Sequence, residues 1–154
     1  MNELIYKEES YAIVGAALEV YNHLGTGFLE SVYQEAMEME LSDRHIPFVS
    51  QQELFLKYRG RQMRKTYIPD FVAFGKIIIE LKAQTVLTAV ESAQAVNYLK
   101  ATALFSVSEG ELAILINFGH AEKVEFKRLF RASKLGTTGH TINTHNNEQN
   151  SISE

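Results

Sequence analysis

The spacing of apolar residues predicts three helices. Apolar side chains recur at helical intervals over residues 3–23 and again over 27–44, and glycines between the two segments supply a stop and a restart. A third helix is predicted over 88–104, with Thr88 as its N-cap and Glu91 placed to complete a capping box. Two helices therefore precede the extended segments of the chain, and one interrupts them.

Five segments have the pattern of β-strands, and they cover residues 48–58, 62–74, 76–83, 111–118 and 124–130. The second is expected to be irregular near Pro69. The third is apolar on both faces at its centre, which predicts a central strand covered from both sides. A helix long enough for a crossover separates the third strand from the fourth, so these two can pair in parallel. The pattern predicts an α/β (α+β) fold in which helices flank both faces of a mixed central β-sheet.

Composition is that of one globular domain. The chain has 154 residues, of which 45% are apolar, and we expect a single domain over residues 1–132. Residues 133–154 have few large apolar side chains and many Asn, Ser and Thr, so a disordered C-terminal tail is expected. The absence of cysteine excludes disulfides and thiolate metal sites. No signal peptide or membrane-length apolar run is visible, which favours a cytoplasmic protein with no membrane partner.

Charge is distributed unevenly along the chain. The net charge of −4 argues weakly against a general nucleic-acid coat protein. Five cations nevertheless fall within nine residues, and these are Lys57, Arg59, Arg61, Arg64 and Lys65. At a β-turn they would contact nucleic-acid phosphates, or they would form a solvated hairpin tip that blunts a sheet edge. The sequence supports both interpretations equally.

Three charged residues interrupt the most apolar hairpin. Asp70, Glu80 and Lys82 lie beside the apolar segments 71–74 and 77–79, where a buried charge is costly unless it is paired or bound to metal. A three-residue loop would place Asp70 opposite Glu80 with Cβ atoms ~5 Å apart, whereas a two-residue turn would place Asp70 on the other face. Such a carboxylate pair needs a counter-charge, which Lys82 and a Mg²⁺ or Mn²⁺ ion can supply. A Glu-x-Lys strand taken alone is more often solvated or self-paired.

These residues resemble the signature of the PD-(D/E)XK nuclease superfamily, which is present as Pro69-Asp70 followed by Glu80-Leu81-Lys82. The resemblance implies a restriction-endonuclease-like core of the αβββαβ type, in agreement with the elements predicted above.

Two further motifs sharpen the resemblance, which extends from about residue 11 to residue 118. Residues 27–33 fit the Gly-x-x-Glu-x-x-Tyr pattern that names the GxxExxY family within the superfamily. Residues 94–98 are similar to the Gln-x-x-x-Tyr helix motif of its exonuclease-like branch.

The resemblance also implies roles for single residues. The implied metal ligands are Asp70, Glu80, the backbone carbonyl of Leu81, and Glu30 from the preceding helix. The implied catalytic residues are the three acidic side chains together with Lys82, Gln94 and Tyr98. Gln94 and Tyr98 are four residues apart and share one face of the crossover helix.

The leading interpretation is a Mg²⁺- or Mn²⁺-dependent nuclease that hydrolyses phosphodiester bonds. DNA is favoured over RNA only because the superfamily mostly acts on DNA. The alternative is a non-catalytic nucleic-acid- or protein-binding module that retains the fold, and a homo-oligomer or a subunit of a larger complex is also open. The joint presence of Asp70, Glu80 and Lys82 favours the enzyme, because a module without catalysis has no need of unpaired carboxylates.

Overall fold

The structure, a computed structural model, describes residues 5–102 and 111–131. The tail expected over residues 133–154 and the predicted end of the third helix at residue 104 lie outside this part of the chain. Within it, no helix combines the length and the apolar character needed to cross a membrane.

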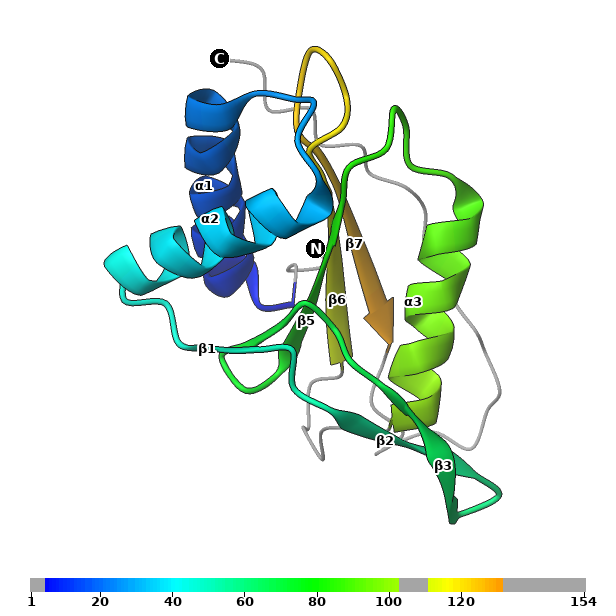
Figure 1. The fold of residues 1–154 in the computed structure, drawn as a ribbon. Coiled ribbons are helices and arrows are strands. Elements are labelled where there is room, and N and C mark those ends of the chain that lie inside the picture. The colour runs from blue at the N-terminus through cyan, green and yellow to red at the C-terminus, as the bar shows by residue number, and fades with distance from the viewer. Residues whose placement is uncertain (1–4, 103–110, 132–154) are drawn as a thin grey trace.

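A five-stranded mixed sheet forms the centre of the molecule (Figure 1). Its strands are, in spatial order, β1 (Phe48–Ser50), β4 (Phe71–Ala73), β5 (Ile77–Lys82), β6 (Glu111–Asn117) and β7 (Glu125–Arg131). β5 and β6 are parallel, and the other neighbours are antiparallel. The crossover between the parallel strands contains α3 (Ala89–Thr102), as predicted.

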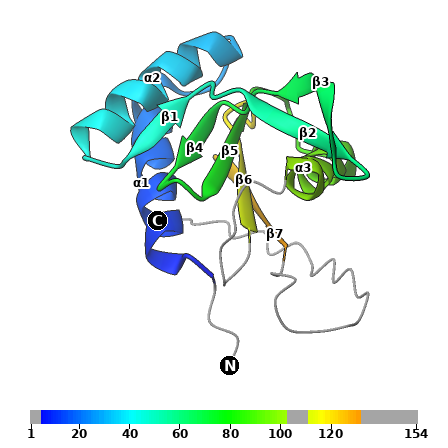
Figure 2. The same ribbon diagram turned by 90° about the horizontal axis from the view of Figure 1, so that it is seen from below.

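Helices cover both faces of this sheet. α1 (Lys7–Leu24) and α2 (Glu30–Asp43) lie on one face and α3 on the other (Figures 1 and 2). Alternation along β5 produces the two layers: Ile77 and Ile79 join the apolar cluster of α1 and α2, whereas Ile78 joins that of α3. All three are buried, so the predicted central strand and the predicted fold class are confirmed.

A hairpin between β1 and β4 extends beyond the sheet. β2 (Leu54–Tyr58) and β3 (Arg61–Tyr67) form a separate two-stranded sheet. This β2–β3 hairpin, residues 54–67, projects from the body of the molecule and is called the arm below (Figures 1 and 2).

The prediction of one strand over 48–58 is wrong, because the strand is interrupted at the base of the arm, and the segment 62–74 is interrupted at the predicted irregularity near Pro69. Gln51 has a left-handed φ of 49°, and Pro69 lacks the N–H that a continued ladder would use. The pairing register is the same on both sides of the interruption, with Ser50 opposite Phe71 and Leu54 opposite Tyr67. The arm is therefore the outer part of one long hairpin that bends at residues 51–53 and 68–70.

The turn between β4 and β5 sets which side chains face the site. Ala73 pairs with Ile77, so residues 74–76 form the loop, and of the two turns considered the structure has the three-residue one. Phe74 and Gly75 make this turn with left-handed φ angles of 55° and 66°. Extended by one pair beyond Phe71 and Ile79, the register places residue 70 opposite residue 80.

Candidate active site

A cavity of about 250 Å³ opens where the base of the arm, α3 and the sheet meet. Glu80 and Lys82 line it from β5, on the face that also carries Ile78. Gln94 and Tyr98 line it from α3. The structure thus brings four of the residues implied by the sequence into one cavity.

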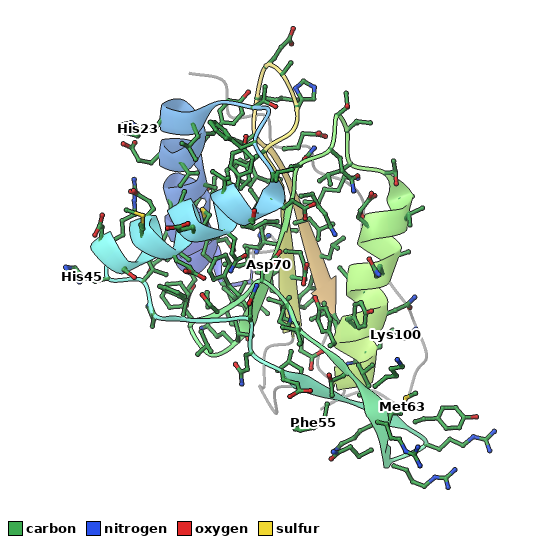
Figure 3. The ribbon with its side chains drawn as sticks, in the orientation of Figure 1. His23, His45, Phe55, Met63, Asp70 and Lys100 are labelled. Carbon is green, nitrogen blue, oxygen red and sulfur yellow. The ribbon has the colours of Figure 1, made fainter. Side chains whose placement is uncertain are left out.

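Asp70 lies at the bend between β3 and β4 and is held by three hydrogen bonds. Its Oδ2 accepts a hydrogen bond from the backbone N–H of Leu81 at 2.6 Å. Its backbone carbonyl accepts from the N–H of Gln51 at 3.0 Å and from Nε2 of Gln34 at 3.2 Å. These bonds attach Asp70 to β5 and α2 in the middle of the molecule (Figure 3).

Glu80 is contacted by a buried tyrosine. The hydroxyl of Tyr67, the last residue of β3, donates a hydrogen bond to Oε1 of Glu80. The Tyr67 ring is stacked on the Tyr98 ring, with 3.8 Å between the ring centroids and 2° between the ring planes. Burial raises the pKa of Tyr67 far above its ordinary value, so the phenol remains a neutral hydrogen-bond donor.

Burial makes both carboxyl groups hard to ionise. It raises the pKa of Asp70 above its ordinary value. It also raises the pKa of Glu80 to about 7, and the neighbouring charge of Asp70 adds to this effect. The Tyr67 hydrogen bond and the charge of Lys82 act in the opposite direction but do not cancel it. Among the described residues Lys82 forms no ion pair with either carboxyl group, so it acts on them only as a nearby charge.

The first turn of α3 has the predicted capping box. Oε2 of Glu91 accepts hydrogen bonds from the backbone N–H of Thr88 at 2.9 Å and from its Oγ1 at 2.6 Å, and Oγ1 of Thr88 accepts from the N–H of Val90 at 3.3 Å. The hydrogen bond from the Thr88 hydroxyl is the main reason that the pKa of Glu91 falls to about 2. Because Glu91 also lines the cavity, the cap anchors the helix at the site that Gln94 and Tyr98 share.

A buried asparagine fixes the backbone that leaves β5. Asn117, at the end of β6, pairs in register with Lys82. Its side-chain amide accepts from the N–H of Gln84 at 2.9 Å and donates to the Gln84 carbonyl at 2.8 Å. A Cβ on Gly119 would lie 2.2 Å from that carbonyl oxygen, so only glycine fits beside this contact. The sequence reasoning missed Asn117, although a polar residue closing an apolar strand was a visible signal.

A family comparison bears on this site. A model of the PD-(D/E)XK nuclease superfamily matches residues 7–129, which include the strands and the helix that line the cavity. The chain belongs to the PD-(D/E)XK nuclease superfamily. No curated protein and no solved structure matches it.

The donor atoms of this PD-(D/E)XK site fit a divalent metal ion. Nucleases of the superfamily generally use such ions. Asp70 and Glu80 offer the oxygen donors that Mg²⁺ and Mn²⁺ prefer, and burial raises the pKa of both carboxyl groups. In the described part of the chain, no three His, Cys, Asp or Glu side chains are grouped closely enough to hold a metal.

The Gly-x-x-Glu-x-x-Tyr segment of this PD-(D/E)XK chain contacts the site indirectly. Tyr33 is fully buried, and its hydroxyl donates to the Gly25 carbonyl at 2.6 Å, which closes the loop between α1 and α2. Glu30 is the first residue of α2 and is exposed, outside the carboxylate pair. Gln34, one turn later, is the α2 side chain that contacts Asp70, and the sequence reasoning missed it.

The arm carries the predicted cationic cluster, and all five of its members are exposed. Phe55 and Tyr58 of the arm are also more than half exposed (Phe55 is labelled in Figure 3). The Arg59 guanidinium lies over the Tyr58 ring, 5.4 Å from its centroid. Cations and aromatic rings therefore share one solvent-facing element.

Proposed function

We propose that this protein is a divalent-metal-dependent nuclease that hydrolyses phosphodiester bonds in DNA. The observation that carries the proposal is that Asp70 and Glu80, both half-buried, lie at opposed positions in the extended β4–β5 register, and that Glu80 lines the cavity together with Lys82. A surface that only binds nucleic acid gains nothing from half-buried carboxylates, because they repel phosphate. A site that holds a cation between carboxylate and phosphate needs them.

The proposed metal ligands are Asp70, Glu80 and the backbone carbonyl of Leu81. The N–H of Leu81 donates to Oδ2 of Asp70, so the backbone at Leu81 lies beside the Asp70 carboxylate. A bound Mg²⁺ or Mn²⁺ ion would polarise a phosphoryl oxygen and lower the pKa of a water molecule. Lys82 would orient the attacking water and offset the negative charge that develops on the phosphate. Gln94 has amide N–H donors at the same cavity and would hydrogen-bond the phosphate.

The assignment to the GxxExxY family is part of the same proposal and is supported by the segment 27–33. Gly27 has a φ of 106°, a conformation that favours glycine, at the start of the motif. Glu30 shares a face of α2 with Gln34, which contacts Asp70. Glu30 would therefore join the ligands from the α2 side when the ion is bound.

The arm is proposed to bind the nucleic-acid backbone. Its five exposed cations would contact phosphates, and Phe55 and Tyr58 would contact bases. In this arrangement the cations that attract the nucleic acid would lie on the arm, whereas the carboxylates would lie at its base.

Cleavage assays test the proposal directly. Wild-type protein is incubated with linear duplex, nicked and single-stranded DNA and with RNA, in Mg²⁺, Mn²⁺ or EDTA. Glu80→Ala and Lys82→Ala are compared with Lys7→Ala, which alters an exposed lysine of α1. We expect metal-dependent cleavage of DNA by the wild type and by Lys7→Ala, and its loss in the two site variants.

Three outcomes contradict the proposal. Equal cleavage by every preparation would indicate a contaminating nuclease. Binding of nucleic acid without cleavage in either metal would favour a binding module that retains the fold. Cleavage of RNA alone would overturn the assignment of DNA as the substrate.

A further inference from the structure

We infer that Tyr67 is a positioning residue for Glu80, and that Tyr98 acts on the site through Tyr67. This inference rests on the proposed metal-dependent function, because it concerns how one carboxylate ligand is held. Tyr67 lies outside every motif identified in the sequence, and it reaches the site from the arm.

The hydrogen bond to Oε1 restricts the orientation of the Glu80 carboxylate. A glutamate carboxylate has broad torsional minima about its last side-chain bond, so it adopts many orientations when nothing holds it. The Tyr67 hydroxyl engages Oε1 and thereby limits the rotation of the carboxylate before any ion binds. Loss of a hydrogen-bonding partner that orients a metal ligand typically lowers metal affinity or activity by roughly 10–100-fold.

Tyr67 can orient Glu80 because its own ring is held in place by packing. The Tyr98 ring of α3 stacks on it in parallel, with 3.8 Å between the ring centroids. Tyr67 also pairs with Leu54 across the arm, and both residues belong to the apolar cluster under α3. Only 8% of Tyr67 is exposed, so the phenol has no solvent-facing role.

The contacts therefore form a chain from α3 through β3 to β5. Tyr98 packs on Tyr67, and Tyr67 hydrogen-bonds Glu80. This chain gives the tyrosine of the Gln-x-x-x-Tyr motif a function that does not require it to touch substrate. It also couples the base of the arm, where the substrate is proposed to bind, to the orientation of a metal ligand.

Calorimetric titration with Mn²⁺ in the absence of nucleic acid tests the inference. The proteins compared are the wild type, Tyr67→Phe and Tyr21→Phe. Tyr67→Phe removes one hydroxyl and retains the stacked ring. Tyr21→Phe is the matched control, because its hydroxyl donates to the His120 carbonyl at 2.9 Å, outside the cavity. We expect Tyr67→Phe to bind Mn²⁺ about 10-fold more weakly or worse, and Tyr21→Phe to bind it as the wild type does.

The outcomes separate this inference from the proposed function. Wild-type affinity, or tighter binding, in Tyr67→Phe overturns the inference while the metal site stands. No Mn²⁺ binding by the wild type overturns the proposed function and the inference with it. Tyr98→Leu retains the Tyr67 hydroxyl but removes the stacked ring, and it decides the matter if Tyr67→Phe fails to fold. We expect weaker Mn²⁺ binding in this variant, and wild-type affinity there would contradict the chain of contacts.

Discussion

Replacing Glu80 with glutamine is expected to make the metal-free protein more stable above neutral pH. Burial raises the pKa of this carboxyl from 4.5 to about 7. A carboxyl group whose pKa is raised by folding stabilises the folded state while it is protonated. That stabilisation is fully present below the unfolded pKa of 4.5 and is lost as the pH rises through about 7.

The magnitude follows from the size of the pKa shift. A change of one pKa unit corresponds to about 1.4 kcal/mol, so ionisation of Glu80 in the folded protein costs about 3 kcal/mol. The raised pKa of Asp70 acts in the same direction. The lowered pKa of Glu91, about 2, has the opposite sign, but its contribution is lost only at acidic pH, below this window.

Urea unfolding between pH 4.5 and 8.5, in EDTA, measures the effect. The free energy of unfolding of the wild type should fall by about 3 kcal/mol relative to Glu80→Gln across this range. Glu19→Gln, on α1 and away from the cavity, should follow the wild type. Mg²⁺ added at pH 8.5 should stabilise the wild type more than Glu80→Gln. Parallel pH curves for the wild type and Glu80→Gln would refute the reasoning.

Three other variants test the support of the site and the role of the arm. Asn117→Ala leaves the N–H and carbonyl of Gln84 unpaired, so urea unfolding should show a loss of about 2 kcal/mol or more; a change below about 0.5 kcal/mol would argue against the contact. Thr88→Ala removes the cap of α3 and should cost about 1 kcal/mol in the same assay, whereas an unchanged stability would mean that solvent replaces the cap. The double variant Arg61→Ala/Arg64→Ala should bind duplex DNA with a weaker salt dependence. The slope of log affinity against log salt concentration, measured by fluorescence anisotropy, should fall in magnitude by about 2. An unchanged slope would mean that these two cations do not contact DNA phosphates.

The register of the central hairpin could be narrowed from the sequence to two alternatives, a two-residue and a three-residue turn. Of these, only the three-residue loop puts Asp70 and Glu80 on one face, and the observed pairing of Ala73 with Ile77 has that loop. The central position of β5 was predictable, since Ile77–Ile79 is apolar on both faces. In both cases the residues that decide the structure are close together in the sequence.

The bend at the base of the arm was not predictable in the same way. Pro69 signalled an irregularity, but the partner strand breaks at Gln51, a residue type with no strong preference for its left-handed conformation. The bend is also contacted from another element, since Nε2 of Gln34 in α2 donates to the Asp70 carbonyl. Local pattern contains no information on such a contact.

The supporting residues of the site were missed for a related reason. Tyr67 had the pattern of an ordinary strand tyrosine, and its contact with Glu80 exists only because β3 and β5 are brought together by the bend. Gln34 likewise contacts Asp70 across 36 positions of the chain. Motif spacing identified the carboxylates and the lysine, whereas the residues that orient them depend on tertiary packing.

The central claim is that Asp70 and Glu80 together hold a divalent ion. An anomalous difference map from crystals grown with Mn²⁺ tests it most directly, with crystals of Glu80→Gln as the comparison. The account predicts one strong peak in contact with both carboxylates in the wild type and its loss in the variant. A peak elsewhere in the molecule, or the same peak retained in Glu80→Gln, would contradict it.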